Sequence, residues 1–169
     1  MDLVNYLDKI EKKLYSNFDL HKEHELNGIN FDMYAKYNLR SERYVLTKKA
    51  KLYGIENNEH TFFKYFNSLR ESEVDKVTSI IIDNIETIVK PHSEHMSSNV
   101  NLIIVVDSSL SELDPDLIKV IKKFKYHKGF LFGLRGWADF GLILYSLKDE
   151  LVITNKKGED VKKIYSEVE

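Results

Sequence analysis

The chain contains no cysteine, only two prolines and only seven glycines in 169 residues. Without cysteine it can form no disulfide bond and perform no thiolate chemistry, which fits a reducing compartment. With so little glycine and proline, no stretch has the composition of a flexible linker, so we expect a single domain over residues 1–169. The N-terminal segment lacks the basic and apolar regions of a signal peptide, and we expect a cytoplasmic protein.

Strong charge of one sign is also missing. The formal net charge is −2, so the molecule as a whole has no field that would attract nucleic acid or a membrane surface. No run approaches the roughly 20 apolar residues that a membrane-spanning helix needs, and we expect no membrane partner. The hydrophobic fraction of 43% and the aromatic fraction of 12% nevertheless suffice for a real core.

The most apolar stretch is V-N-L-I-I-V-V-D at residues 100–107. It is short and rich in β-branched residues, and polar residues flank it on both sides. Such a run predicts a central strand buried on both faces, which the other elements must cover. Asp107 ends this strand, where open α/β sheets often carry functional groups, although it can equally cap the following turn.

Apolar residues at helical spacing predict four helices, at residues 2–17, 68–90, 115–128 and 161–168. Ser68 and Glu71 have the spacing of a capping box, and Asp114 followed by Pro115 is typical of a helix N-terminus. Residues 21–28 are polar and read as a loop that ends in the turn Asn27-Gly28.

Strict alternation predicts a strand at residues 29–39 with one buried face, formed by Ile29, Phe31, Met33, Ala35, Tyr37 and Leu39. A returning strand is expected to start at residues 43–47, and residues 52–56 continue it or begin another. After a turn at Asn57-Asn58, residues 61–66 form the next strand, which makes an antiparallel meander. Three later strands are expected at 130–134, 141–147 and 151–154. The order α-βββ-α-β-α-βββ-α indicates an α+β domain with a mixed sheet, an antiparallel meander, a central buried strand and covering helices.

Histidine spacing gives a first candidate site. His21 and His24 flank Lys-Glu, and His92 and His95 flank Ser-Glu. Two imidazoles three residues apart can share one metal ion, and glutamate can add an oxygen ligand. We predict these four histidines as metal ligands if the two stretches meet. The alternative is that both are solvated loops, and the longer H-E-x-x-H pattern of zinc proteases is absent.

A basic aromatic segment gives the second candidate. Residues 117–138 contain no acidic side chain but six cations, interleaved with aromatic residues. Because cations pair with phosphates and aromatic rings stack on bases, we predict binding of an anionic ligand or nucleic acid. The residues chosen are Lys119, Lys122, Lys123, Arg135 and Trp137. Alternatively, the lysines form a solvated helix face, the phenylalanines belong to the core, and acids from the first helix or from residues 23–25 neutralise the segment.

Three glycines surround Arg135 in G-L-R-G-W-A-D-F-G, at residues 133–141. Glycine permits a tight turn or the close approach of a ligand, and arginine suits a carboxylate or phosphate. Neither glycine-rich phosphate-binding motif occurs. We therefore favour a structural hairpin in which Arg135 pairs with Asp139.

Three stretches, R-S-E-R-Y-V-L-T-K-K-A-K-L-Y-G-I-E-N-N-E-H, K-K-F-K-Y-H-K-G-F-L-F-G-L-R-G-W and V-I-T-N-K-K-G, cover residues 40–60, 122–137 and 152–158. They are similar to a family of small prokaryotic proteins of unknown function, found mostly in clostridia and some archaea. The resemblance extends over nearly the whole chain and implies no activity.

The element order also resembles that of the restriction-endonuclease-like nucleases, which begin with a helix, a three-strand meander, a helix and a strand. That resemblance implies a metal held by Asp32 together with Glu56 or Glu59. Neither glutamate is followed two residues later by the lysine of the family's signature. Our leading interpretation is a non-enzymatic binding or interaction module, and a divergent metal-dependent nuclease is the alternative. No cofactor is identified, and a homo-oligomer is compatible with the sequence.

Overall fold

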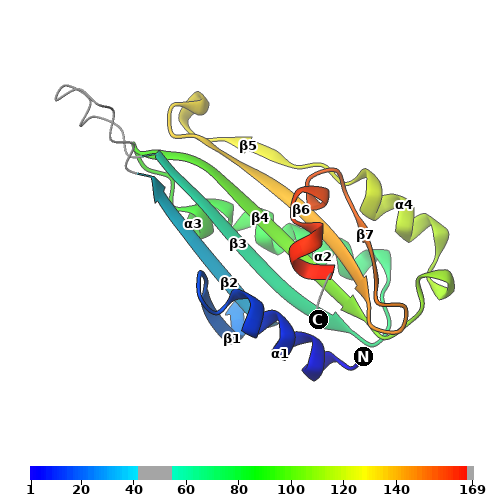
Figure 1. The fold of residues 1–169 in the computed structure, drawn as a ribbon. Coiled ribbons are helices and arrows are strands. Elements are labelled where there is room, and N and C mark those ends of the chain that lie inside the picture. Colours follow the sequence, from blue (N-terminus) through cyan, green and yellow to red (C-terminus); the bar gives the residue numbers. More distant parts are fainter. Residues whose placement is uncertain (42–54, 167–169) are drawn as a thin grey trace.

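A seven-stranded mixed sheet forms the centre of the structure, a computed structural model that describes residues 1–41 and 55–166. The strand order is β1-β2-β3-β4-β6-β5, and β7 pairs with β6 (Figure 1). The strands are β1 Asp19–Leu26, β2 Ile29–Ser41, β3 Ile55–Phe66, β4 His95–Val106, β5 His127–Gly129, β6 Trp137–Ser146 and β7 Leu151–Thr154. β1, β2 and β3 form an antiparallel meander, whereas β3, β4 and β6 run parallel. The expected α+β class with a mixed sheet is confirmed.

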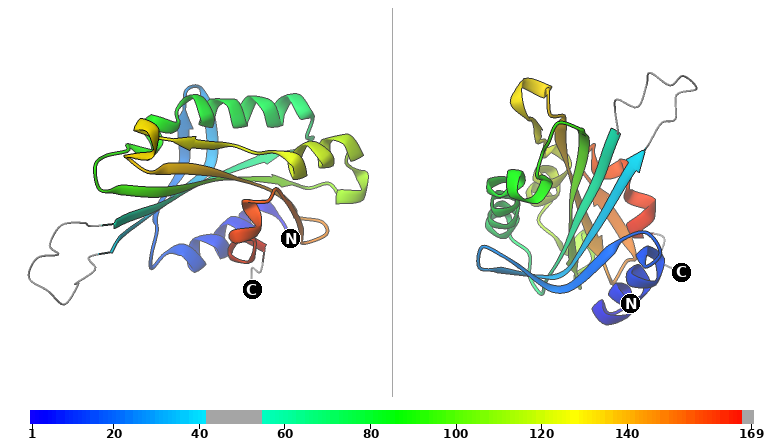
Figure 2. Two further views of the ribbon diagram at one scale, coloured as in Figure 1. Left: turned by 90° about the horizontal axis from the view of Figure 1, so that it is seen from above. Right: turned by 90° about the vertical axis from the view of Figure 1, so that its left-hand side faces the viewer.

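Helices cover both faces of the sheet and make three layers (Figure 2). One face carries α2 Glu71–Asp83, α3 Ile85–Val89 and α4 Pro115–Lys123; the other carries α1 Leu3–Leu14 and α5 Lys162–Ser166. The predicted helix at 68–90 is thus two helices that meet at Asn84. Within the two described ranges, no helix has the length and apolar character required to cross a membrane.

β4 is the central strand that the apolar run predicted. It lies between β3 and β6, and residues 102–106 are at most 1% exposed. Leu102 and Ile104 face the core under α2 and α4, while Ile103 and Val105 face the core under α1 and α5. A continuous apolar run is required here because a sheet covered on both faces leaves no side of the strand in water.

The single buried face predicted for residues 29–39 is wrong. Ile29 and Phe31 belong to the core under α2, but Met33 and Ala35 belong to the core under α1. The β1–β2 ladder omits the pair Glu23–Asp32, and Glu23 has φ 54°. This irregularity moves later residues to the other face, a shift that a period of two cannot predict.

Several expected boundaries also differ. Residues 19–26 form the edge strand β1 instead of a loop, because an exposed edge strand carries no apolar alternation. Asn57-Asn58 continues β3 instead of turning, and residues 130–134 form a turn with a short 3₁₀ helix, Leu131–Gly133, instead of a strand. The expected strand at 43–47, and residues 52–54 of the next, lie outside the described residues.

Of the two predicted helix starts, the one at α4 is confirmed and the one at α2 lies two residues later. Asp114 caps α4, since its carboxylate accepts a hydrogen bond from the Asp116 amide at 2.9 Å, as predicted. At α2, however, the amide of Arg70 donates to the Glu73 carboxylate at 2.8 Å, so the N-cap lies two residues later than the Ser68–Glu71 pair indicated. The Arg70 guanidinium has only donors and returns no hydrogen bond to the Glu73 amide.

Candidate functional site

The segment between β5 and β6, residues 130–137, is a turn that we call the hairpin tip. The Phe130 amide donates to the Gly136 carbonyl at 2.9 Å, and the Gly133 and Arg135 amides donate to the Phe130 carbonyl at 3.0 and 3.1 Å. Leu131, Phe132 and Gly133 have φ values of 48°, 54° and 84°. Consecutive left-handed residues with bulky side chains are sparsely populated in proteins, so these hydrogen bonds hold a strained turn.

The hairpin tip exposes large apolar side chains to solvent. Phe132 is 102% exposed, Leu134 77%, Leu131 56% and Trp137 38%. Eight large apolar side chains are exposed among the described residues; these are four of them, and Met96 is a fifth that lies against the tip. Single exposed apolar residues are ordinary, but a contiguous set marks an interaction surface.

His95 fastens the hairpin tip to β4. Its Nδ1 lies 2.7 Å from the Arg135 carbonyl oxygen, and its Nε2 lies 2.9 Å from the Ser98 hydroxyl. The ring also packs edge-on against Phe130, with 5.8 Å between ring centroids. Both ring nitrogens therefore contact protein oxygens, which leaves neither of them facing a metal ion.

The structure does not bring the four predicted metal ligands together. His21 and His24 lie on β1, whereas His95 starts β4 and His92 precedes it, with β2 and β3 in between. Three strand spacings amount to about 14 Å, too far for a shared ion. Across residues 1–41 and 55–166, no group of three or more metal-binding side chains is placed to hold a metal.

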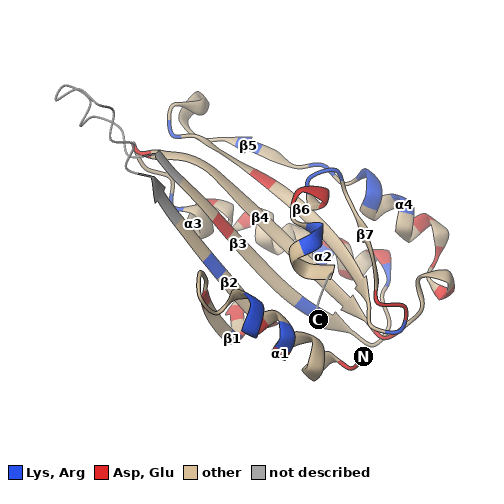
Figure 3. Ribbon diagram, in the orientation of Figure 1, with Lys and Arg blue, Asp and Glu red and all other residues tan. Residues whose placement is uncertain are grey.

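The five predicted anion-binding residues fall into two groups. Figure 3 shows the lysines of α4 and the hairpin tip at opposite ends of β5. Lys119 pairs with Asp116 at 2.8 Å, and Arg135 and Trp137 belong to the tip. The α4 lysines therefore do not lie beside Arg135 and Trp137, since Phe124 ends the helix and β5 carries the chain to the other end, and anion binding by these five residues stays a prediction.

The alternative, in which acids of the first helix or residues 23–25 neutralise the segment, is not what the described ion pairs show. Lys128, which lies in this segment, pairs with Glu86 of α3 at 2.7 Å. The acids Asp8 and Glu11 of α1 hold Lys22 of β1, at 4.0 and 2.7 Å.

Asp139 pairs with other partners than the expected Arg135. His127 Nδ1 lies 2.8 Å from one carboxylate oxygen and Lys157 Nζ lies 2.9 Å from the other. Burial acts to raise the pKa of Asp139, but the hydrogen bonds from His127 and Lys157 outweigh it and hold this pKa below its ordinary value. Arg135 is thereby left at the exposed turn.

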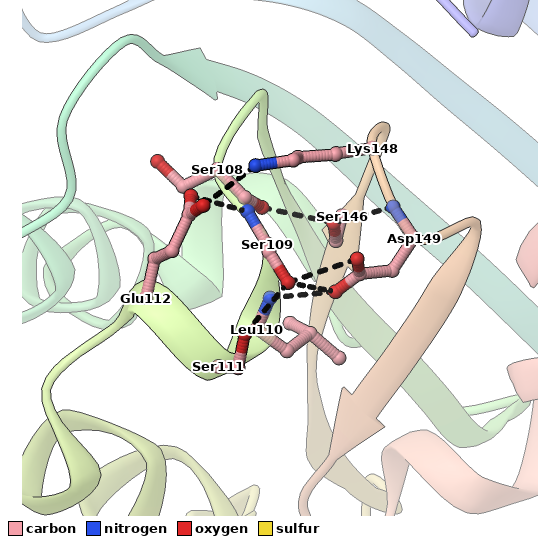
Figure 4. Close-up of polar contacts among 8 residues, drawn as sticks. All are labelled: Ser108, Ser109, Leu110, Ser111, Glu112, Ser146, Lys148 and Asp149. Carbon is pink, nitrogen blue, oxygen red and sulfur yellow. Dashed lines mark hydrogen bonds and ion pairs between the residues drawn. The ribbon is translucent and has the colours of Figure 1, made fainter.

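The carboxyl ends of β4 and β6 carry a polar network that we call the carboxyl edge (Figure 4). Asp149 accepts hydrogen bonds from the Leu110 amide at 2.7 Å and the Ser109 hydroxyl at 2.8 Å. The Ser146 hydroxyl donates to the Ser108 carbonyl at 2.9 Å, and Lys148 donates to Glu112 at 2.6 Å. The Leu110 and Ser109 bonds lower the pKa of Asp149, so it stays an acceptor at neutral pH.

The carboxylates of the nuclease resemblance do not converge. Asp32 accepts a hydrogen bond from the Tyr65 amide at 2.7 Å, while Glu59 pairs in register with Tyr37, five residues further along β2. That separation is about 17 Å along the strand. The Glu59 carboxylate accepts from Tyr165 at 2.5 Å and Asn101 at 3.1 Å, which anchors α5 to the sheet. The side chain of Glu56 lies outside the described part of the structure.

Two further groups were not singled out from the sequence. No sequence pattern pointed to His127, because its partner Asp139 is brought close only by the β5–β6 ladder. His60 is 1% exposed, and its Nδ1 lies 2.7 Å from the Tyr34 hydroxyl. Its Nε2 has no hydrogen-bond partner among the described residues. Burial first, and then the nearby side chains of Lys36, His95 and Lys90, lower the pKa of His60 to about 4.

A family model described as "Domain of unknown function (DUF8052)" matches residues 2–167. No curated protein and no solved structure matches the chain. The family match agrees with the expected likeness to a family of unknown function.

Proposed function

We propose that this chain, which belongs to the family described as "Domain of unknown function (DUF8052)", is a non-enzymatic binding module that docks onto its partner through the hairpin tip. One observation carries the proposal: the tip holds Leu131, Phe132 and Leu134 in solvent on a strained turn. Strain of this kind persists only where surrounding contacts maintain it, and it clusters at functional segments. A partner that covers the tip would remove its apolar surface from water.

The polar groups support the same interpretation. The carboxylates of Asp139, Asp149 and Glu59 each accept hydrogen bonds from neighbouring side chains or amides. Groups that hold one another in this way contribute to the fold, and a catalytic centre needs some of them turned toward a substrate.

Site-specific photocrosslinking tests the proposal in cells. A benzophenone amino acid at position 132 should give a discrete adduct, because Phe132 points fully into solvent. Tyr15 of α1, 80% exposed, is the matched control position and should not give that adduct. The same adducts at both positions, or neither a protein nor a lipid adduct at 132, would contradict docking through the tip.

The nuclease alternative requires Asp32 and Glu56 or Glu59 around one metal ion, and the separation of Asp32 from Glu59 gives it no support. It predicts magnesium- or manganese-dependent cleavage that Asp32→Ala abolishes. A wild-type protein that leaves single- and double-stranded DNA and RNA intact would remove this alternative.

A further inference from the structure

We infer that the hairpin tip docks into the interfacial region of an anionic lipid bilayer. The inference rests on the proposed function and names the partner of the same surface. It concerns docking at a membrane surface, in which the domain stays outside the bilayer and only the tip enters the headgroup region.

The tip has the shape for such a surface. It extends past the end of β6 and stands away from the helical layers in both the front and the side view (Figures 1 and 2). Phe132, at 102% exposure, has no neighbour covering it among the described residues. A convex apolar point needs a deep pocket in a protein partner, whereas a bilayer interface accepts it without one.

The side chains follow the polarity gradient of an interface. Leu131, Phe132 and Leu134 occupy the turn, and Trp137 lies where the turn joins β6. Tryptophan is enriched at the level of lipid headgroups, and arginine can extend from apolar surroundings toward phosphate. Arg135 is exposed on the tip, and its expected partner Asp139 pairs with His127 and Lys157 instead.

The backbone of the tip is prepared for a region poor in water. The amides of residues 133–136 all donate to carbonyls within the tip, and His95 contacts the Arg135 carbonyl. Unpaired amide and carbonyl groups are expensive away from water, so internal pairing lowers the free energy required for insertion.

The charge along the edge that carries the tip favours an anionic surface. No acidic residue occurs between Leu117 and Ala138. Seen from above, the tip, β5 and α4 follow one another along one edge of the molecule (Figure 2). Lys122, Lys123 and Lys125 are exposed on that edge, at the other end of β5 from the tip, so they add long-range attraction to an anionic surface and not a contact with its headgroups.

Vesicle binding tests the inference with an intrinsic reporter, because Trp137 is the only tryptophan of the chain. The full-length protein is titrated with large unilamellar vesicles of phosphatidylcholine containing about one third phosphatidylglycerol, and with pure phosphatidylcholine vesicles. We expect a blue shift of the Trp137 emission and co-sedimentation with the anionic vesicles, both weakened by salt. Phe132→Ser with Leu134→Ser should weaken partitioning about tenfold or more, given the transfer free energy of the two side chains. The control Leu151→Ser, 59% exposed on β7, should bind like the wild type.

The outcomes distinguish failure of the lipid partner from failure of the proposed docking function. Absence of co-sedimentation at low salt, or equal binding by the tip variant and the wild type, overturns the inference. If position 132 crosslinks to a protein in cells while vesicles are not bound, the lipid partner is wrong and the proposed docking function stands. If vesicles are not bound and position 132 gives no specific adduct, both fail. A thermal melt that matches the wild type shows that the tip variant is folded.

Discussion

The parallel strands β4 and β6 end in two contrasting surfaces. At the carboxyl edge, Asp149 accepts from the Ser109 hydroxyl and its amide donates to the Ser146 hydroxyl, which in turn donates to the Ser108 carbonyl. These bonds close the loops onto the sheet. At the other end, the amides of Phe130 and of residues 133–136 donate to carbonyls within the hairpin tip, but Phe132 and Leu134 are exposed to solvent. The first surface would lose hydrogen bonds if it were rearranged to meet a ligand. Covering the second surface would remove apolar side chains from water, which is favourable.

In this chain the candidate surface does not lie at the location that is usual for ligand sites in open α/β sheets. Open α/β sheets commonly bind ligands at the carboxyl ends of their strands. In this chain the polar groups there hold the structure together, and Asp107 accepts a hydrogen bond from Tyr65. The candidate surface lies at the amino end of β6, in a turn that the sequence pattern assigned to a strand.

The largest effect is expected from a substitution that unfolds the domain and so destroys both surfaces. Ile104 lies in the middle of β4 and is fully buried. Ile104→Asp places an unpaired charge in the core, which costs several kcal/mol against a total stability of about 5–15 kcal/mol. We expect an unfolded or aggregated protein by circular dichroism. A soluble variant with an unchanged melting curve would contradict the central position of β4.

A matched glycine pair tests the rigidity of the tip. A Cβ at Gly136 would lie 2.2 Å from the Met96 carbonyl oxygen, at φ 74°, whereas one at Gly133, φ 84°, meets nothing within 4 Å. Gly133→Ala should lower the free energy of unfolding by about 1 kcal/mol, from backbone strain alone. Gly136→Ala should lower it by roughly 3 kcal/mol or more, because the backbone of β4 must also move. Equal values in urea unfolding would show that the tip is not held against β4.

His60 makes stability depend on pH at the same end of the molecule. Its pKa of about 4 lies below the ordinary 6.5, so between these values the unfolded chain binds a proton that the folded chain does not. The free energy of unfolding should therefore fall as the pH drops from about 6.5 toward 4, by about 2 kcal/mol at pH 5. His60→Gln, which keeps a hydrogen-bonding side chain beside Tyr34, should remove this part of the decrease. Parallel pH profiles for variant and wild type would refute a buried neutral His60.

A substitution in the carboxyl edge should lower the stability of the protein and leave its vesicle binding unchanged. Asp149→Ala removes the acceptor for the Leu110 amide and the Ser109 hydroxyl. We expect the melting temperature to fall by roughly a few degrees, as for loss of a capping carboxylate. The Trp137 emission with anionic vesicles should match that of the wild type. Reduced vesicle binding by a folded Asp149→Ala protein would show that the two ends are coupled.

The smallest effect is expected from the lysines of α4. We consider the triple variant Lys119→Glu, Lys122→Glu, Lys123→Glu. These positions lie outside the buried face formed by Leu117 and Ile121, so the melting curve should barely change. Each exposed charge contributes at most about 1 kcal/mol, and that contribution is screened by salt. The variant should therefore bind anionic vesicles with a shallower salt dependence and retain the blue shift. Strong retention of oligonucleotides by the wild type, lost in this variant, would instead favour the nucleic acid partner predicted from the sequence.

Local chemistry was enough to determine a large part of this protein. A run of β-branched residues specified the buried strand β4, Asp114 with Pro115 specified the start of α4, and helical spacing specified α1. Each depends on side chains that lie close together in the chain, so periodicity and capping preferences suffice to predict it.

Only the tertiary structure decided where the functional candidates lie. The separation of α4 from Arg135 depends on β5, which is three residues long and leaves no periodic signal. The pairing of Asp139 with His127 and Lys157, the shift of face between Phe31 and Met33, and the exposure of Phe132 all arise from contacts between distant segments. An alternating F-L-F-G-L favours a strand locally, but the backbone hydrogen bond from Phe130 to Gly136 and the contact of the His95 ring with the Arg135 carbonyl hold a left-handed turn. The same apolar side chains that composition assigns to a core are thereby placed in solvent.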